Sequence, residues 1–226
     1  MTEKKPAIIY ADASLLVINK PAGVLSVPDG YDQALPYVIR LLEPVYGRLW
    51  VVHRLDKDTS GVMVLARNSE VHGWLNTQFA ERQVSKVYHA IIHGSPDWDE
   101  KIVDLPLRSN VGRRNRTVVD NKRGRPSLTR FRVLKRYPGY VLMGAQPKTG
   151  RTHQIRAHLY DLGFAILSDP LYGSGNISPF IPRLALHARS LTFRHPITRM
   201  MQTFEASYPQ EFKQALSFFR DIIQGV

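Results

Sequence analysis

Short apolar segments, separated by turn residues, recur along the chain and predict β-strands. Runs of about four to eight residues that are apolar throughout, or that alternate with polar residues, are typical of strands. We predict strands at the segments Ile8–Tyr10, Leu15–Ile18, Leu49–Val52, Val62–Ala66, Val87–Ile92, Leu128–Leu134, Tyr140–Ala145 and Leu184–Leu191. The segment Lys20–Pro28 contains two prolines and Gly23 and has neither periodicity, so we expect a loop there.

Apolar residues three or four positions apart predict helices in other segments. The predicted helices cover residues 33–42, 69–82, 151–163 and 209–223. Ser69 is expected to cap the second helix, and Gly163 to end the third. Strands and helices mix without regular alternation. This favours an α+β fold, with a mixed, largely antiparallel sheet flanked by helices and loops, in a single domain over residues 1–226.

The charge balance favours a polyanionic partner. The chain has 31 Lys and Arg against 19 Asp and Glu, a net charge of +12. Such a field attracts nucleic acid first, and an anionic membrane or an acidic protein less well. No apolar run approaches the ~20 residues of a membrane span, and the first ten residues lack the apolar core of a secretory signal. We therefore expect a cytoplasmic protein that contacts nucleic acid and no membrane.

One basic segment, at about residues 108–136, contains eleven Lys and Arg against a single acid, Asp120. Glycines and a proline are interspersed, which predicts a mobile hairpin that grips phosphates. An exposed, solvated face is the alternative, but so lopsided a run exceeds that expectation. The residues expected to bind nucleic acid in this segment are Arg113, Arg114, Arg116, Lys122, Arg123 and Arg125.

The stretch HRLDKDTSG, residues 53–61, lies between two predicted strands, where functional side chains are commonly presented. Asp58 begins an ordinary turn sequence that ends at Gly61, and we interpret it as a turn residue. Asp56 follows the apolar Leu55 and should be partly buried, so it needs a partner. From the spacing alone, a structural ion pair and a catalytic carboxylate fit Asp56 about equally well.

Two other segments offer partners for such a carboxylate. In TGRTHQIRAHL, from Thr149, helical spacing holds Arg156 near the core edge, where its guanidinium against Asp56 would keep that carboxylate ionised. Arg151, in the expected first turn, could meet a phosphate or be a solvated charge. Tyr88, in a predicted strand, fits a core residue best on spacing alone, and a stacking platform for an extruded base is the alternative.

Metal and hydrolase chemistry is poorly supported. His153 and His158 are five positions apart, which misses the H-E-x-x-H spacing, and no Glu accompanies them. The chain has no Cys for a thiolate site, no G-x-S-x-G elbow and no phosphate-cradling Walker loop. We expect no metal site.

Taken together, these segments resemble the RluA family of RNA pseudouridine synthases. The matching stretches are NKPAGVLSVP (Asn19–Pro28), HRLDKDTSG (His53–Gly61), KVYHAIIHG (Lys86–Gly94), TGRTHQIRAHLYDLGFAILSDPLYG (Thr149–Gly173) and LALHARSLTFRHP (Leu184–Pro196). Their order and separation agree over nearly the whole chain. The resemblance implies a single pseudouridine synthase catalytic domain in a short form without the S4-like RNA-binding domain of some relatives.

The resemblance also implies roles for individual residues. It makes Asp56 the catalytic aspartate, Tyr88 the active-site tyrosine and Arg156 the basic residue paired with that aspartate. Arg54 matches an arginine that fills the space left by a flipped nucleotide, and Leu186 lies in an apolar segment that packs the pocket. Two further residues, Arg151 and His153, are expected to contact the substrate.

The implied activity is isomerisation of uridine to pseudouridine in structured ribosomal RNA, transfer RNA or both, with the target base flipped out of its stack. No redox step or leaving phosphate is involved, so neither metal nor cofactor is implied. We expect a monomer without an obligatory protein partner. The alternative is a catalytically silent RNA-binding protein on the same fold, which need not keep Asp56, Tyr88 and Arg156 together.

Overall fold

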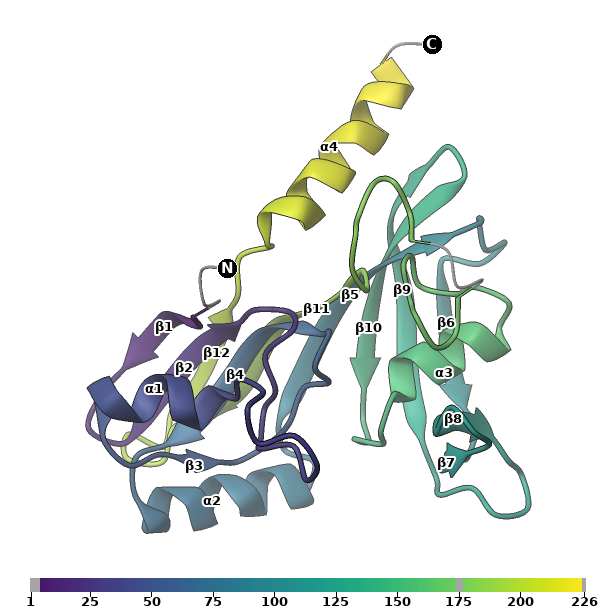
Figure 1. Ribbon diagram of the computed structural model, residues 1–226. Helices are drawn as coiled ribbons and strands as arrows, with labels where there is room; N and C mark the ends of the chain where they lie inside the picture. The colour runs from purple at the N-terminus through teal and green to yellow at the C-terminus, as the bar shows by residue number, and fades with distance from the viewer. Residues whose placement is uncertain (1–4, 174–176, 225–226) are drawn as a thin grey trace. The chain divides into compact units, whose positions relative to one another are not determined.

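The computed structural model describes residues 5–173 and 177–224, and these fall into two compact units. Unit 1 comprises the described residues up to Lys86 together with Ala188–Ser207, and unit 2 comprises Val87–His187 and the described residues from Tyr208 on. The chain therefore passes from unit 1 into unit 2 after Lys86, returns at Ala188 and enters unit 2 again at Tyr208. The α+β fold class is confirmed, because the described residues contain a large strand content together with four helices (Figure 1). The single domain over residues 1–226 stays a prediction.

Unit 1 is built around the apolar strand β4. The antiparallel strands β1 (Ala7–Ala11), β2 (Leu15–Lys20) and β4 (Ser60–Ala66) lie side by side, and the short β3 (Trp50–Val51) also pairs with β4. On the other side of β4 runs β11 (Leu186–Arg194), which belongs to this unit from Ala188 on and pairs with β12 (Met201–Glu205). Every residue of β4 is buried. The two helices of the unit are α1 (Val38–Tyr46) and α2 (Ser69–Ala80).

Unit 2 contains four antiparallel strands that lie side by side and a separate hairpin. The sheet order is β5 (Ser85–His93), β10 (Tyr140–Pro147), β9 (Leu128–Tyr137) and β6 (Glu100–Asp104). The strands β7 (Leu107–Val111) and β8 (Arg116–Val119) pair with each other, and the helices are α3 (Gln154–Asp161) and α4 (Gln210–Gln224). Side chains of the sheet, α3 and α4 form one apolar core, which includes Ile91, Phe131, Met143, Leu159, Phe212 and Phe219.

The predicted helix beginnings need correction. The first helix begins at Val38 rather than at residue 33, because the side chains of Asp29 and Asp32 accept backbone N–H groups and fold the preceding residues into turns. The cap of α2 is Asn68 instead of Ser69, and its side chain accepts the N–H of Val71 at 2.8 Å.

The third helix begins at Gln154 instead of Arg151. The side chain of Gln154 accepts both the Thr149 hydroxyl, at 2.7 Å, and the Arg151 N–H, at 3.0 Å, so residues 149–153 form a closed loop. His153, at the end of this loop, has left-handed backbone angles (φ 53°, ψ 21°). Strands β6 and β12 were not predicted, and β7 and β8 were expected only as a hairpin without stated bounds in the basic segment.

Candidate active site

The loop that contains Asp56 is fixed immediately before and immediately after that residue. The buried hydroxyl of Ser26 donates to the carbonyl of Leu55 at 2.7 Å and accepts the Leu55 N–H at 2.9 Å. On the other side, the carbonyl of Lys57 accepts the N–H of Gly23 at 2.8 Å and the ammonium of Lys20 at 3.1 Å. All these residues belong to unit 1. The predicted loop at residues 20–28 therefore acts as a clamp on the Asp56 loop.

Lys20 is a structural cation in this clamp. Its side chain is 0% exposed, and besides Lys57 its ammonium contacts the carbonyls of Pro21 and Val24 at 3.1 and 2.7 Å. A buried ammonium is stable only when such acceptors replace its water. The segment that resembles the family motif NKPAGVLSVP thus has a clear local role, which is to bind the backbone beside Asp56.

The first residue of the Asp56 motif is held as a neutral imidazole. Burial, with a smaller contribution from the positive charge of Lys86, lowers the pKa of His53 to about 3. Its Nε2 atom accepts the N–H of Val64 at 3.1 Å, and its ring stacks on Phe79 with 4.7 Å between centroids. His53 therefore anchors one end of the motif to β4 and α2.

The other end of the motif requires glycine. Gly61 has φ +123°, and a Cβ atom there would lie 2.2 Å from the carbonyl oxygen of Ala188 on the neighbouring strand. Between the two anchors, the Thr59 N–H donates to the Asp56 carbonyl at 3.1 Å and closes the expected turn around Asp58. Asp56 is half-buried and Arg54 is exposed.

In unit 2, Arg156 forms a buried bidentate ion pair. The side chain is 4% exposed, and Nε and Nη2 donate to the two carboxylate oxygens of Asp169 at 2.8 and 2.7 Å. Burial alone would raise the pKa of Asp169, but the guanidinium and the N–H groups of Leu171 and Tyr172 outweigh it and hold that pKa below its usual range. The ring of Tyr172 lies 5.1 Å from the guanidinium carbon. The orientation of Arg156 is therefore fixed by its own unit.

The same network reaches His153. The hydroxyl of Tyr172 lies 3.3 Å from Nδ1 of His153, and it also bonds both the N–H and the carbonyl of Thr117 in β8. Two more predicted residues of unit 2 lie in strands of the main sheet. Tyr88 in β5 pairs with Ala145 and is half-buried against the core, and Leu186 in β11 is buried in it.

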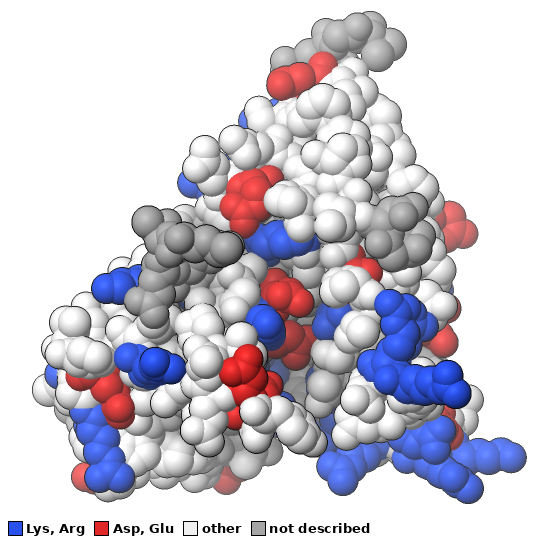
Figure 2. All heavy atoms as spheres, viewed as in Figure 1, with Lys and Arg blue, Asp and Glu red and all other residues white. Residues whose placement is uncertain are grey.

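The basic segment is a folded part of unit 2. Figure 2 shows Lys and Arg gathered over the hairpin β7–β8, at the lower right of that face. Arg116 lies over the rings of Tyr160 and Tyr172, at 5.7 and 5.5 Å, and Arg114 donates to the carbonyl of Pro170 at 3.2 Å. The segment is thus packed on the loop that holds Asp169, which the sequence did not indicate.

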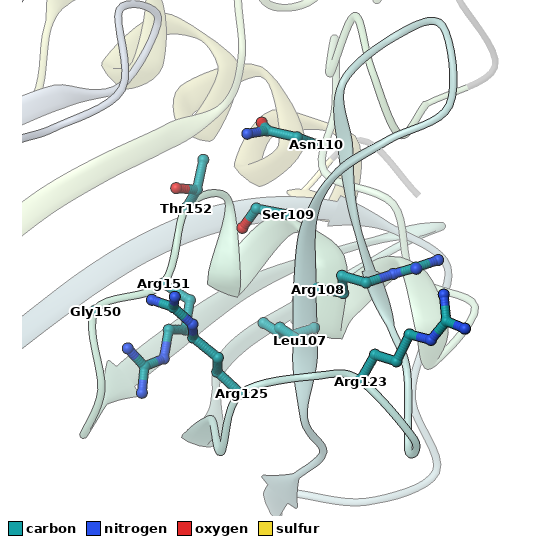
Figure 3. A pocket seen from close by; sticks show the side chains of 9 residues that line it. All are labelled: Leu107, Arg108, Ser109, Asn110, Arg123, Arg125, Gly150, Arg151 and Thr152. Atoms are coloured by element: carbon teal, nitrogen blue, oxygen red, sulfur yellow. The ribbon is translucent and has the colours of Figure 1, made fainter.

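Three of the predicted cations line a pocket of about 460 Å³ in this unit (Figure 3). Arg123, Arg125 and Arg151 face it, whereas Arg113, Arg114, Arg116 and Lys122 are not among its lining residues. The sequence-based interpretation missed Arg108, which also lines the pocket.

The structure groups the predicted catalytic residues by unit. Asp56 and Arg54 belong to unit 1, and Tyr88, Arg156 and Leu186 belong to unit 2, so the joint roles expected of them stay predictions. Ser26, Lys20, Asp169 and Tyr172 were not singled out, although all four lie in stretches that match the family. Among the described residues, no group of three His, Asp or Glu side chains could hold a metal ion, and no helix is long and apolar enough to cross a membrane.

Comparisons with known proteins agree with this picture. The family described as RNA pseudouridylate synthase matches residues 14–161. A dual-specificity RNA pseudouridine synthase RluA of Pasteurella multocida is 39% identical over 88% of this chain and 91% of that protein. A ribosomal large subunit pseudouridine synthase D of Zymomonas mobilis is 37% identical over 91% of this chain and 70% of that protein. The solved structure of human RNA pseudouridylate synthase domain containing 4 is similar with a TM-score of 0.78 and 28% identity, over 95% of this chain and 93% of that one.

Proposed function

The chain belongs to the RNA pseudouridine synthase family and is an isomerase that acts on RNA, and we propose that it converts a uridine of ribosomal RNA, transfer RNA or both into pseudouridine with Asp56 as the catalytic carboxylate. The reaction breaks the bond between N1 of uracil and C1′ of ribose, and it forms a bond between C5 and C1′. The proton on C5 is lost and N1 gains one, so the composition of the nucleotide does not change. No electron acceptor, metal or organic cofactor is required by this balance.

The observation that supports Asp56 most directly is the clamp around it. A carboxylate that adds to C1′, or that removes the proton from C2′, must be held close to the sugar in one orientation. Hydrogen bonds from Ser26 to Leu55, and from Lys20 and Gly23 to Lys57, fix the backbone on both sides of Asp56. Asp58, in contrast, lies within the turn that follows.

The remaining catalytic roles are proposed from the family resemblance. Arg156 supplies the guanidinium that keeps Asp56 ionised. A guanidinium has five N–H donors, and Asp169 accepts from two nitrogens of the Arg156 fork. Tyr88 stacks on the uracil, and the buried Leu186 packs the apolar wall behind it. Apolar surroundings keep the detached uracil from escaping before it is rejoined.

The target base must first leave its stack, which costs a few kcal/mol. We propose that the exposed Arg54 occupies the space that the base leaves, and that Arg151 and His153 contact the flipped nucleotide or its phosphates. The six basic residues predicted above contact the RNA backbone. The relatives named above act on ribosomal RNA or have dual specificity by their names, which supports these substrate classes. We further propose that the enzyme acts as a monomer in the cytoplasm, where these RNAs are found.

Release of tritium from RNA labelled at C5 of uridine tests the proposal. Ribosomal and transfer RNA from a strain that lacks the enzyme would be assayed separately, with and without a chelator. The matched variants are Asp56→Asn and Asp58→Asn, which remove the same charge two positions apart in one motif. We expect release by wild type and by Asp58→Asn in both conditions, and none by Asp56→Asn, although its RNA affinity is retained. Undiminished release by Asp56→Asn would refute the assignment.

A further inference from the structure

The pocket in Figure 3 combines four arginines with no carboxylate in its lining. Arg108 comes from β7, Arg123 and Arg125 come from the turn after β8, and Arg151 comes from the closed loop before α3. Asp120 forms an ion pair with Arg108, with 2.9 Å between Oδ2 and Nε. Among the described residues it is the only carboxylate that forms an ion pair with any of the four arginines. The N–H groups of Arg123 and Lys122 and the charge of Arg108 hold the pKa of Asp120 below its usual range, so it stays ionised and offsets only one cation.

Hydrogen bonds and close packing within the chain fix the backbone that presents these arginines. The N–H and carbonyl of Arg125 exchange two hydrogen bonds of 2.9 Å with Leu107, and the Gly124 N–H donates to the Asp120 carbonyl at 2.8 Å. A Cβ atom at Gly124 would lie 2.4 Å from the Asp120 carbonyl oxygen and 2.7 Å from the Pro106 carbonyl carbon. Only glycine allows this close packing. Its two neighbours in the sequence, Arg123 and Arg125, are therefore presented from one turn.

Contacts within the chain also orient two of the guanidinium groups. Arg108 is held by Asp120 at 2.9 Å, and Arg151 donates to the carbonyl of Pro126 at 3.3 Å. In the view of Figure 3 the arginines form two pairs, Arg125 with Arg151 and Arg108 with Arg123, on either side of Leu107. Cations held in place lose less entropy on binding, and a planar guanidinium fork matches the oxygens of a phosphate.

The other lining residues decide which part of a nucleic acid fits. The lining includes Ser109, Asn110 and Thr152, which offer hydroxyl and amide groups, but no aromatic ring on which a base could stack. A volume of about 460 Å³ lies within the roughly 300–1,000 Å³ typical of ligand pockets, which is more room than one phosphate group needs. The chemistry and size fit a stretch of sugar–phosphate backbone, with the polar side chains available to 2′-hydroxyl groups.

We propose that this pocket binds a segment of the substrate RNA backbone and is the principal phosphate grip of unit 2, ahead of the arginines at the tip of the β7–β8 hairpin. The proposal deepens the proposed function, since it takes RNA as the substrate and adds where its backbone is held. It separates Arg123 and Arg125 from Arg113, Arg114 and Arg116, which the sequence placed in one undivided basic segment.

Equilibrium binding of a fluorescent RNA hairpin, measured over a range of salt concentrations, tests the proposal. The pocket variant is Arg123→Gln with Arg125→Gln, since both residues line the pocket and are exposed. Lys213→Gln with Arg220→Gln is the matched control. It removes the same charge from exposed positions on α4, which Figure 1 shows at the other end of unit 2. A third variant, Arg113→Gln with Arg114→Gln, removes the tip.

We expect the pocket variant to lose about tenfold or more in affinity and to lower the salt slope by roughly one to two. The α4 variant should change affinity less than about twofold, and the tip variant less than the pocket variant. Equal losses in the pocket and α4 variants would show that only net charge matters and would overturn the proposal.

A second experiment asks whether phosphate is what the pocket recognises. Single linkages of the RNA hairpin are replaced, one at a time, by neutral methylphosphonates. At the linkage that the pocket holds, wild type should lose affinity and the pocket variant should lose none further, because the contact is already absent. Identical losses in both proteins at every linkage would overturn the proposal. Tritium release is measured separately from RNA binding. A negative result for the pocket would therefore not affect the proposed isomerase activity, and a negative result for Asp56 would not affect the binding measurement.

Discussion

Replacing Ser26 with alanine should separate the positioning of Asp56 from its chemistry. The Ser26 hydroxyl bonds both backbone groups of Leu55, and Ser26 is 3% exposed. Alanine removes one oxygen atom and leaves the carboxylate itself unchanged. The variant therefore tests whether the clamp matters for catalysis.

The magnitude follows from the two hydrogen bonds that are lost. The carbonyl and N–H of Leu55 lie 2.7 and 2.9 Å from the Ser26 oxygen, and Leu55 itself is only 5% exposed. Leaving a buried polar group unsatisfied costs about 1–3 kcal/mol, so the free energy of unfolding should fall by about 2–4 kcal/mol. A displacement of Asp56 by a fraction of an ångström should lower kcat by about tenfold or more, with little change in RNA affinity.

Ser14→Ala is the matched control. Ser14 is equally buried at 3% exposed, it lies in the same unit, and its hydroxyl donates to Asp12 at 2.9 Å. Asp12 keeps the N–H donors of Ser14 and Leu15, both at 2.7 Å, so this variant should lose only about 1 kcal/mol and no activity. Stability is measured by urea unfolding, and turnover by tritium release well below the melting temperature. Equal kcat values for the two variants would refute a positioning role of the clamp.

Three further predictions concern the anchors of the two units. Gly61→Ala should cost about 3–5 kcal/mol in urea unfolding, since its Cβ would meet the Ala188 carbonyl at 2.2 Å with φ at +123°, and a loss under about 1 kcal/mol would contradict the geometry. The pKa of His53 is lowered to about 3, so below about 6.5 the unfolded chain binds a proton that the folded one does not. From pH 7 to pH 5, the free energy of unfolding of wild type should therefore fall by about 2 kcal/mol more than that of His53→Gln. Parallel pH profiles of the two proteins would contradict this prediction. Asp169→Asn should lower the free energy of unfolding by about 3 kcal/mol or more and remove most of the turnover, because Arg156 loses the charged bidentate partner that lies 2.7 Å away. Full tritium release by the folded variant would show that Asp169 does not support catalysis.

Local pattern was enough to predict the elements that bury apolar side chains. β2, β4 and β10 were predicted within a few residues, because their sequences are apolar runs bounded by turns. The missed strands have another origin. Strand β6 (EKIVD) and strand β12 (MQTFE) are mostly exposed, and each pairs with one long neighbour, β9 or β11, so their pairing is set by the tertiary structure instead of by their own periodicity.

The site was predictable only in part, for a similar reason. Motif residues such as Asp56 and Arg156 stand out by their chemistry and by the family resemblance. The groups that hold them lie far along the chain: Ser26 is 29 residues from Leu55, and Lys20 is 37 residues from Lys57. A serine or lysine in a proline-rich loop gives no local sign of a buried hydrogen bond to a distant backbone. Asp169, which is 13 residues from Arg156, was likewise indicated only by its place in a matching stretch.

Within unit 2, the β7–β8 hairpin and the carboxylate that orients Arg156 belong to one network of contacts. Tyr172 bonds the backbone of Thr117 in β8 at 2.8 and 2.9 Å, and its ring lies 5.1 Å from the guanidinium carbon of Arg156. Asp169 accepts from the Tyr172 N–H at 3.0 Å and from Arg156 through both carboxylate oxygens. Tyr172 therefore links the hairpin to the buried ion pair of Arg156 and Asp169. Because buried networks of this kind are rigid when all members are satisfied, RNA bound in the proposed pocket would be held in a fixed relation to Arg156.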